Sequence, residues 1–330
     1  MKDILNRLSQ YNTLSQAEAK EILMRIGQGE FNNSHLAAFM TMFMMRPVTV
    51  EELSGFRDAL MELCVPIDLS SYDGMDLCGT GGDGKNTFNI STLSAFVVAA
   101  CGQNVVKHGN YGVSSKCGSS NLLEHFGYEF TNEQSELEKQ LDKSGICFLH
   151  APKFHPAMRH VGPIRKELGV KTFFNMLGPL VNPARPKKQL AGVFDHELAR
   201  IYAYLFQDTD VQFGIVYDLA GYDECSLTGQ TKVFSNKGEA VINPKDFKLE
   251  RIEVSEIYGG ESIEEAAKIF TDILKGEGTK AQNQVVFANT ALALQAAGMH
   301  ENLTGGVQAA EEAIKSGSAY KVFKELLNLN

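Results

Sequence analysis

The hydrophobic pattern of this 330-residue chain changes near residue 73, and that change constrains the fold most strongly. Before it, apolar residues recur at helical spacing, which predicts helices only. After it, short apolar runs typical of buried strands alternate with helical segments, which indicates a largely parallel sheet with crossover helices. At roughly 150 residues per domain, the length suits two domains. We therefore expect an α/β protein: a small all-helical N-terminal domain, a larger α/β domain with a central mostly parallel sheet, and a cleft between them.

The boundary between the two domains is expected just after residue 70. Residues 1–70 form the predicted helical domain, which helices near residues 155–185 complete, and residues 73–330 form the α/β domain. Two capping boxes favour helices in the first part, because Ser15 precedes Glu18 and Thr49 precedes Glu52 at the required spacing.

One predicted helix of the first domain, Leu36–Met45, is apolar nearly all round, which is typical of a buried helix. It could form the core of the helical bundle. It could equally form a subunit interface, where Met and Phe are over-represented. We expect a homodimer through the N-terminal helical domain.

The rest of the chain predicts alternating strands and helices. The expected strands are Met75–Cys78, Asn104–Val106, Cys147–Leu149, Gly192–Phe194, Gly214–Tyr217 and Lys232–Phe234. Helices are expected to start near Ser91, Ser119, Glu133, Pro156, His196, Ser262, Asn283 and Thr304.

Composition excludes several classes of protein. The net charge of -9 disfavours a general nucleic-acid binder, which needs a basic face. The 6 cysteines form no CxxC pair, so neither a disulfide scaffold nor a zinc site is expected. The N-terminus lacks the apolar core of a signal peptide, and the most apolar stretch, Leu93–Cys101, is too short to span a membrane. We expect a cytoplasmic protein that binds neither nucleic acid nor membrane.

The strongest functional signal is the glycine-rich sequence GTGGDG at residues 79–84, between a predicted strand and a predicted helix. Glycines let backbone N–H groups turn toward an anion, and the following helix N-terminus favours a phosphate. The sequence matches neither GxxxxGK[ST] nor GxGxxG, which disfavours a P-loop or a dinucleotide site. Asp83 suggests a metal or a ribose hydroxyl beside the phosphate. The alternative is a tight turn that binds nothing.

A second loop, residues 106–120, also follows a predicted strand and precedes a helix. It carries Lys107, His108 and several serines among glycines, and lysines and hydroxyls suit phosphate. Two such loops suggest a substrate with two phosphate groups. His108 taken alone is more often a structural histidine than a catalyst.

Three further residues could complete a site. Asp223 and Glu224 follow a predicted strand; adjacent carboxylates are usually a solvated surface, but beside two phosphate loops they become candidate Mg²⁺ ligands. Arg165 could bind a carboxylate through two hydrogen bonds, although a surface role is the commoner one for an arginine on a helix.

Six segments, taken in order, resemble the anthranilate phosphoribosyltransferases over essentially the whole chain. They are GTGGD at 79–83, NIST at 89–92, KHGN at 107–110, HPAM at 155–158 with Arg165, NMLGPLVNP at 175–183 and DE at 223–224. The GTGGD motif is shared with the wider superfamily, whereas KHGN and the HPAM–Arg block are more specific.

The resemblance implies an Mg²⁺-dependent transfer of phosphoribose to anthranilate in tryptophan biosynthesis. It implies that phosphoribosyl pyrophosphate contacts Gly79, Gly82, Asp83, Thr87, Asn89, Ile90, Ser91, Thr92, Lys107, His108, Gly109, Asn110, Tyr111, Gly112, Val113, Ser114, Ser115 and Ser119. Anthranilate would contact Gly79, His108, Asn110 and Arg165, and Mg²⁺ would be held by Ser91, Asp223 and Glu224. An aromatic amine is unprotonated at neutral pH, so we expect no catalytic base, with Lys107 as a charge stabiliser.

The chain departs from the family pattern in its second loop. Tyr111 and Gly112 replace the commoner Arg-Ala, Cys117 stands where many relatives carry Ser, and Ser120 and Asn121 also differ. Two alternatives of related fold are a pyrimidine nucleoside phosphorylase, against which Asn110 and the HPAM and DE segments argue, and a nucleic-acid-binding relative, against which the net charge argues.

Overall fold

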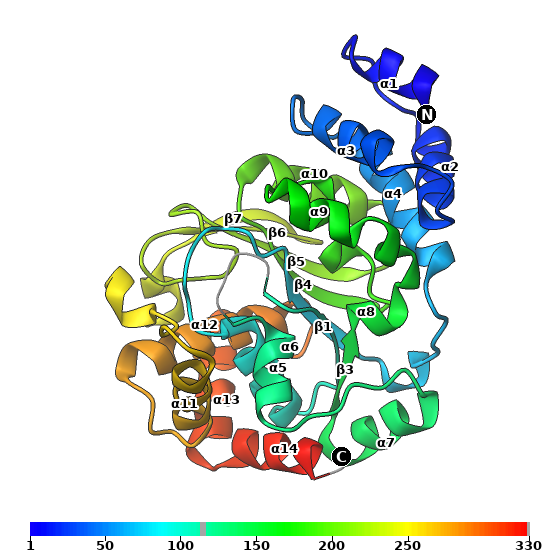
Figure 1. The fold of residues 1–330 in the computed structure, drawn as a ribbon. Helices are drawn as coiled ribbons and strands as arrows, with labels where there is room; N and C mark the ends of the chain where they lie inside the picture. Colours follow the sequence, from blue (N-terminus) through cyan, green and yellow to red (C-terminus); the bar gives the residue numbers. More distant parts are fainter. Residues whose placement is uncertain (113–116, 329–330) are drawn as a thin grey trace.

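The computed structural model describes residues 1–112 and 117–328. Within them, a 7-stranded sheet has the order β3-β2-β1-β4-β5-β6-β7 (Figure 1). Its strands are β1 (Met75–Gly79), β2 (Val105–Gly109), β3 (Ile146–His150), β4 (Lys188–Gly192), β5 (Gln212–Asp218), β6 (Thr231–Ser235) and β7 (Gly238–Ile242). Strands β1 to β5 pair in parallel, whereas β6 and β7 are antiparallel additions at one edge. The predicted mostly parallel sheet is confirmed.

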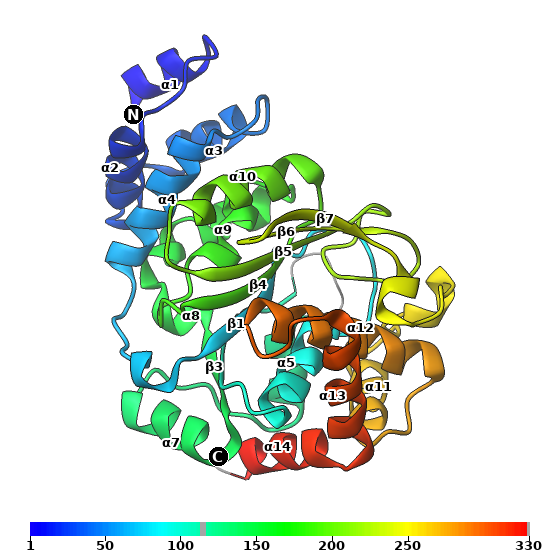
Figure 2. The same cartoon turned by 180° about the vertical axis from the view of Figure 1, so that it is seen from behind.

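The described helices precede, connect and follow the strands. They are α1 (Lys2–Leu8), α2 (Gln16–Gly27), α3 (Asn33–Met42), α4 (Val50–Leu63), α5 (Ile90–Ala100), α6 (Ser119–His125), α7 (Gln134–Ser144), α8 (Ala151–Phe154), α9 (Gly162–Leu168), α10 (His196–Gln207), α11 (Ile263–Leu274), α12 (Lys280–Ala296), α13 (Leu303–Lys315) and α14 (Ser318–Leu327). Helices α5 and α12 pack on one face of the sheet with α13 and α14 behind them, and α10 packs on the other face (Figures 1 and 2). No described helix is long and apolar enough to cross a membrane.

The N-terminal helices share a core with the segment that carries α9. Phe39, Phe43 and Phe56 pack against Phe173. The rings of Phe56 and Phe173 are stacked, with 4.4 Å between their centroids. Both predicted capping boxes are present at the starts of α2 and α4. Aromatic packing of this kind stabilises the bundle beyond the area it buries. The same core continues onto α10 and the face of the sheet beneath it, so the N-terminal helices rest on the side of the sheet opposite α12.

Two expectations need correction, and two described elements lie outside the expected set. The strand expected at Gly192–Phe194 is β4, which ends at Gly192 and starts at Lys188. Its first two residues are polar, so an apolar pattern does not reveal them. Their side chains have partners in the fold, because Lys188 forms an ion pair with Asp73 and the Gln189 amide donates to a backbone carbonyl. Strand β7, most of which is exposed, and helix α14 were not expected. The helix expected at Pro156 is a short 3-10 turn, Pro156–His160.

The predicted burial of the Leu36–Met45 segment is confirmed for most of its length, but not at its end. Helix α3 buries Leu36, Phe39 and Met40. Phe43, directly after the helix, is buried as well, whereas Met44 is 46% and Met45 is 64% exposed. The apolar stretch therefore has one face in the core and one end uncovered.

Candidate active site

A cleft of about 260 Å³ lies at the carboxyl ends of the parallel strands. In open parallel sheets, ligands bind at this edge, where loops from several strands meet. The cleft is lined by the loops that follow β1 and β2, by the turn that follows β5, and by Arg165 from α9. The fold therefore brings together four segments that the sequence singled out separately.

The loop after β1 has a backbone that glycine permits. Gly81, Gly82 and Gly84 have φ values of 62°, 77° and 72°, in the left-handed region that side chains disfavour. Gly79 has a different requirement, because a Cβ atom there would lie 2.4 Å from Oδ2 of Asp223. The loop leads into helix α5, whose N-terminus faces the cleft at Ser91. The backbone N–H of Ser91 donates to Oε1 of Glu224 at 2.9 Å.

The loop after β2 is held to the start of α6. The Ser119 hydroxyl donates to the carbonyl of Asn110 at 3.3 Å, and Oδ1 of Asn121 accepts from the backbone N–H of Gly112 at 3.0 Å and of Gly118 at 3.1 Å. The Tyr111 hydroxyl donates to Glu124 at 2.6 Å. The departures from the family pattern at Tyr111 and Asn121 are therefore structural contacts within this loop. The expected contacts of Val113, Ser114 and Ser115 lie outside the described residues.

Three carboxylates gather between the two loops and the turn after β5. Burial, and then repulsion from Asp83, raises the pKa of Asp223 to about 6. Burial and the Asp223 charge raise the pKa of Glu224 well above its usual range, and burial raises the pKa of Asp83. Crowded carboxylates with raised pKa values suit a cation that would neutralise them.

These residues fit Mg²⁺ better than a transition metal. In the described part of the chain, no group of three or more His, Cys, Asp and Glu side chains is arranged to hold a metal alone. Mg²⁺ is held by one or two carboxylates together with substrate phosphates and water, which is what Asp223 and Glu224 beside two anion loops would offer. The donor set therefore fits an ion that arrives with its phosphorylated substrate.

Lys107, on β2, is buried at the bottom of the cleft, and its side chain extends to β1. Its ammonium donates to the carbonyl of Leu77, and its charge stabilises the ionised form of Asp76. Burial still raises the pKa of Asp76 to about 6, although its Oδ1 accepts from the backbone N–H of His108 at 3.0 Å. Lys107 thus serves the strand pair as well as the cleft it lines.

A second chamber of about 360 Å³ adjoins the cleft and shares His108, Asn110 and Arg165 with it. Its lining residues also include apolar ones, among them Met158 and Phe174, and Phe174 is shared with the cleft. The Arg165 guanidinium lies 5.4 Å from the centroid of the Phe174 ring and donates to Oδ1 of Asn175 at 3.4 Å. Burial lowers the pKa of Arg165, and no described carboxylate pairs with it. A half-buried cation at an apolar wall favours a ligand that carries both a carboxylate and a ring.

Two histidines in this chamber are held in defined orientations. Nδ1 of His108 lies 3.0 Å from the carbonyl of Gly178, and Nε2 of His155 lies 2.9 Å from the carbonyl of Val181. Carbonyl oxygens only accept, so each of these nitrogens carries the proton and the other nitrogen of each ring is an acceptor. Burial lowers the pKa of His108 to about 3 and lowers that of His155. Nε2 of His108 is buried without a partner among the described residues.

The structure gathers most of the sequence-predicted residues around one cleft. Those that line it are Gly79, Gly82, Asp83, Thr87, Asn89, Ser91, Thr92, Lys107, His108, Gly109, Asn110, Tyr111, Gly112, Ser119, Arg165, Asp223 and Glu224. Among the predicted residues that the structure describes, Ile90 is the exception: its side chain is buried in the core, and its N–H donates to the carbonyl of Phe88 at 2.6 Å.

Sequence reasoning missed several lining or supporting residues. Phe174 and Asn175 line the cleft, and Lys171 lies beside Gly82, with its Cε atom 3.5 Å from the position of a Cβ there. All three come from the segment that packs with the N-terminal helices. Only the short Asn-x-Leu-Gly-Pro motif hinted at them. Asp76, visible as the first polar residue before the glycine-rich loop, was not assigned a role.

Comparison with known proteins gives a consistent picture. A glycosyl transferase family α/β domain model matches residues 71–320, and the helical bundle domain model of the same family matches residues 2–64. The anthranilate phosphoribosyltransferase of Flavobacterium johnsoniae is 56% identical over 100% of both chains. That of Thermus thermophilus has a structure with a TM-score of 0.92, 33% identity and 98% coverage of both chains.

Yeast anthranilate phosphoribosyltransferase is also similar and has been solved with ligands. Its structure in complex with phosphoribosyl pyrophosphate and Mg has a TM-score of 0.89 at 29% identity, covering 98% of this chain and 96% of that one. Its complex with 4-fluoroanthranilate has a TM-score of 0.87 at 27% identity, with the same coverage.

Proposed function

Because this chain belongs to the anthranilate phosphoribosyltransferase family, we propose that its cleft binds phosphoribosyl pyrophosphate with Mg²⁺ and that the adjoining chamber binds anthranilate. The enzyme transfers the phosphoribosyl group to anthranilate and releases pyrophosphate, a step of tryptophan biosynthesis. One observation carries the assignment of the site: a cleft with crowded carboxylates and glycine-rich loops adjoins a mostly apolar chamber lined by Arg165, a cation with no ion pair to any described carboxylate.

In this proposal the two glycine-rich loops bind the phosphate groups. Residues 79–83 and Ser91, at the N-terminus of α5, line the cleft together with residues 107–112 and Ser119. Glycine-rich loops and helix N-termini of this kind suit phosphate groups. Lys107 adds positive charge beneath the leaving group. These groups are fixed by the fold before substrate arrives, so little reorganisation is needed as negative charge develops on pyrophosphate.

Ser91, Asp223 and Glu224 would hold Mg²⁺. When bound, the ion supplies charge neutralisation to the pyrophosphate group. Phosphoribosyl pyrophosphate bound in the cleft would present its ribose C1 carbon to the adjoining chamber. In the reaction the C1–O bond to pyrophosphate breaks, the C1–N bond to anthranilate forms, and the proton released by the amine passes to water.

Anthranilate would be oriented by contacts at both of its polar groups. Arg165 would bind its carboxylate, while the ring lies among apolar walls that include Phe174. His108 and Asn110 line both the cleft and the chamber and would lie beside the amine, as would Gly79, which lines the cleft. A histidine whose pKa is about 3 accepts a hydrogen bond but is a poor base, so positioning is expected to supply much of the rate.

Two domains with the expected boundaries would allow closure over the substrates. We propose that residues 1–70 move together with the helices near residues 155–185 against the rest of the α/β domain of residues 73–330. Arg165 and Lys171 belong to the first unit, and the glycine-rich loops belong to the second. Closure of one unit on the other would exclude water from a reactive ribosyl centre.

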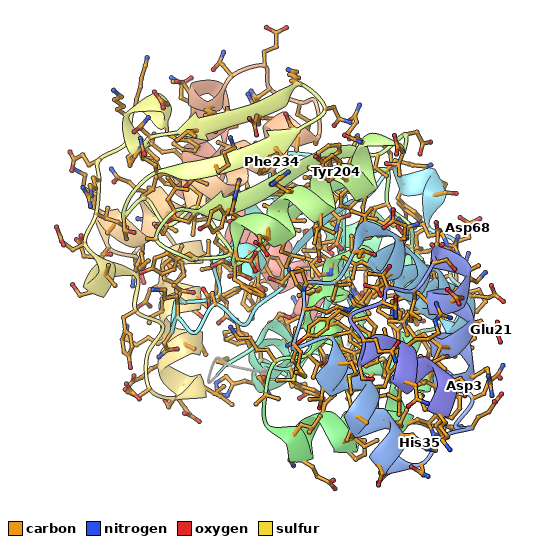
Figure 3. The ribbon with its side chains drawn as sticks, turned by 90° about the horizontal axis from the view of Figure 1, so that it is seen from above. Asp3, Glu21, His35, Asp68, Tyr204 and Phe234 are labelled. Atoms are coloured by element: carbon orange, nitrogen blue, oxygen red, sulfur yellow. The ribbon has the colours of Figure 1, made fainter. Side chains whose placement is uncertain are left out.

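We also propose a homodimer formed through the N-terminal helices and a cytoplasmic location. Met44 and Met45 follow the end of α3 and are exposed. Figure 3 shows Asp3 on α1 and His35 on α3 at the outer side of the N-terminal helices. Exposed methionines of this kind are typical of interfaces. All six cysteines are free thiols, which suits a reducing compartment.

Replacing Met45 with Glu tests the dimer. A charge in an apolar interface opposes association, and we expect the dissociation constant of the dimer to rise by about tenfold, as for interface residues that contribute more than about 1 kcal/mol. Sedimentation velocity over a range of protein concentrations measures this. Val254→Glu, at another exposed apolar residue, is the control. An unchanged sedimentation profile for Met45→Glu would show that Met45 does not lie in the dimer interface.

Buried His108 predicts an acid-sensitive stability. Its pKa is about 3 in the folded protein and 6.5 ordinarily, so between these values the unfolded chain binds more protons. The contribution of His108 to stability is therefore fully present above pH 6.5 and is lost as pH falls toward 3. His108→Gln retains a donor to Gly178 and should flatten the pH dependence of the unfolding free energy by up to about 1.4 kcal/mol per pH unit.

Urea unfolding at a series of acidic pH values measures that slope. Burial raises the pKa of Asp76, which acts with the opposite sign, so the parent and the variant must be compared under identical conditions. Parallel profiles for the two proteins would show that His108 does not titrate as proposed.

The activity itself is tested by the loss of anthranilate fluorescence when purified protein is mixed with phosphoribosyl pyrophosphate and Mg²⁺. We expect turnover that stops when Mg²⁺ is chelated, and no phosphorolysis of thymidine or uridine. Folded protein that cleaves a pyrimidine nucleoside with phosphate but leaves anthranilate unchanged would instead support the phosphorylase alternative.

A further inference from the structure

We propose that Asn289, on helix α12 behind the cleft, is a positioning residue that holds the Asp223–Glu224 turn in its Mg²⁺-binding geometry. The inference rests on the proposed role of the two carboxylates as Mg²⁺ ligands. Asn289 does not line the substrate cleft, and the sequence motifs that identify the family do not include it. Its contacts give it this role.

The Asn289 amide binds the backbone of the residue that follows Glu224. Its Oδ1 accepts from the N–H of Cys225 at 3.0 Å, and its Nδ2 donates to the carbonyl of Cys225 at 2.8 Å. The same Nδ2 donates to the carbonyl of Val285 at 2.8 Å, one turn earlier on α12. Asn289 is only 4% exposed. A side chain that both donates and accepts is needed to satisfy the two backbone groups of one residue, and an amide does so without charge.

The opposite side of the turn rests against two glycines. A Cβ atom at Gly192, the last residue of β4, would lie 1.7 Å from the backbone carbonyl oxygen of Asp223. A Cβ atom at Gly79, the last residue of β1, would lie 2.4 Å from the Asp223 carboxylate. The turn therefore packs directly on the sheet backbone and has no room to shift toward it. Movement away from the sheet is what the Asn289 hydrogen bonds oppose.

The flanks of the turn are tied down as well. Oδ1 of Asp218, at the end of β5, accepts from the N–H of Ala220 at 2.8 Å, and its Oδ2 accepts from the N–H of Ser226 at 3.1 Å and from the Ser226 hydroxyl at 2.7 Å. Asp218 thus fixes the two ends of the turn. Asn289 acts at the residue directly beside the carboxylate pair.

This restraint matters because two adjacent carboxylates repel each other when no cation lies between them. Asp83 adds a third negative charge nearby. If the turn were free, the carboxylates would separate, and each binding event would have to bring them together again. Residues that orient metal ligands typically change metal affinity by about 10–100-fold when they are removed. We expect the Asn289 amide to act at the lower end of that range.

The experiment is a calorimetric titration of Mg²⁺ into the full-length enzyme in the presence of inorganic pyrophosphate. For Asn289→Ala we expect the Mg²⁺ dissociation constant to rise by about tenfold. The Mg²⁺ concentration that gives half-maximal turnover should shift in parallel, and saturating Mg²⁺ should restore most of the turnover. A variant that was merely less stable would not be rescued by Mg²⁺ in this way.

Asn283→Ala is the matched control. Asn283 lies on the same helix, and its amide donates to the carbonyl of Gly278 at 3.1 Å, away from the turn. The Mg²⁺ affinity of the Asn283→Ala enzyme should therefore equal that of the parent. Asp223→Asn, measured in parallel, separates the two hypotheses. If Asp223→Asn binds Mg²⁺ as the parent does, the proposed metal site is wrong.

If Asp223→Asn loses Mg²⁺ affinity while folded Asn289→Ala keeps the parental value, the positioning role is wrong. If Asn289→Ala does not fold, Asn289→Asp carries the same test, because it retains an acceptor for the Cys225 N–H and lacks the donor to its carbonyl. A parental Mg²⁺ affinity in Asn289→Asp would then overturn the proposal.

Discussion

Glu224→Gln is expected to lower Mg²⁺-dependent turnover by at least about a hundredfold, because a metal ion contributes several kcal/mol to transition-state stabilisation. The replacement is close in shape and can still accept the Ser91 N–H that binds Oε1 in the parent. What it removes is one of two adjacent negative charges. The folded structure should be at least as stable as the parent without metal, since the repulsion between Asp223 and Glu224 is relieved.

Initial rates measured against Mg²⁺ concentration, together with thermal unfolding, test this prediction. Glu250→Gln, at an exposed carboxylate that pairs with Lys280 on the surface, controls for a general effect of charge. The account would be contradicted by a Glu224→Gln enzyme that keeps the parental rate at limiting Mg²⁺. A collapse of thermal stability would instead indicate that Glu224 is a structural residue.

Arg165→Ala is expected to raise the KM for anthranilate by about 10–100-fold, the equivalent of losing one buried hydrogen bond to a charged group at about 1.5–3 kcal/mol. The KM for phosphoribosyl pyrophosphate should change little, because the glycine-rich loops belong to the other side of the cleft. The guanidinium is held by the Phe174 ring and by Asn175, so it is already in place before a carboxylate arrives. Arg165→Lys should recover only part of the loss, since an ammonium lacks the planar pair of donors.

Steady-state kinetics with each substrate varied in turn provide the measurement. Lys166→Ala is the matched control, because Lys166 is the next residue on α9 and is exposed to solvent. An Arg165→Ala enzyme with an unchanged KM for anthranilate and a raised KM for phosphoribosyl pyrophosphate would reverse the assignment of the two pockets.

The sequence predicts the parts of this protein that depend on local pattern. The glycines of the first loop adopt a left-handed backbone that depends only on the loop itself. The capping boxes at Ser15 and Thr49 are also local, because each closes within one helical turn. The chain also places Asp223 and Glu224 after a strand, and parallel pairing alone brings that strand end to the same edge as the glycine-rich loops.

The parts that escaped prediction depend on contacts between distant segments. Strand β4 begins with polar residues whose partners lie elsewhere in the fold, and β7 is exposed because it forms the edge of the sheet. Gly192 and Asn289 show no local signal, yet both touch the turn that carries the carboxylates. Only the folded chain reveals why these positions suit a glycine and an asparagine.

The measurement that tests the account most directly is a crystal structure of the enzyme with phosphoribosyl pyrophosphate, Mn²⁺ in place of Mg²⁺, and anthranilate. Anomalous scattering locates the Mn²⁺ ion without ambiguity. The account predicts an ion bound between the pyrophosphate and the carboxylates of Asp223 and Glu224, with the anthranilate carboxylate on Arg165. An ion bound away from both carboxylates, or anthranilate lying among the glycine-rich loops, would contradict it.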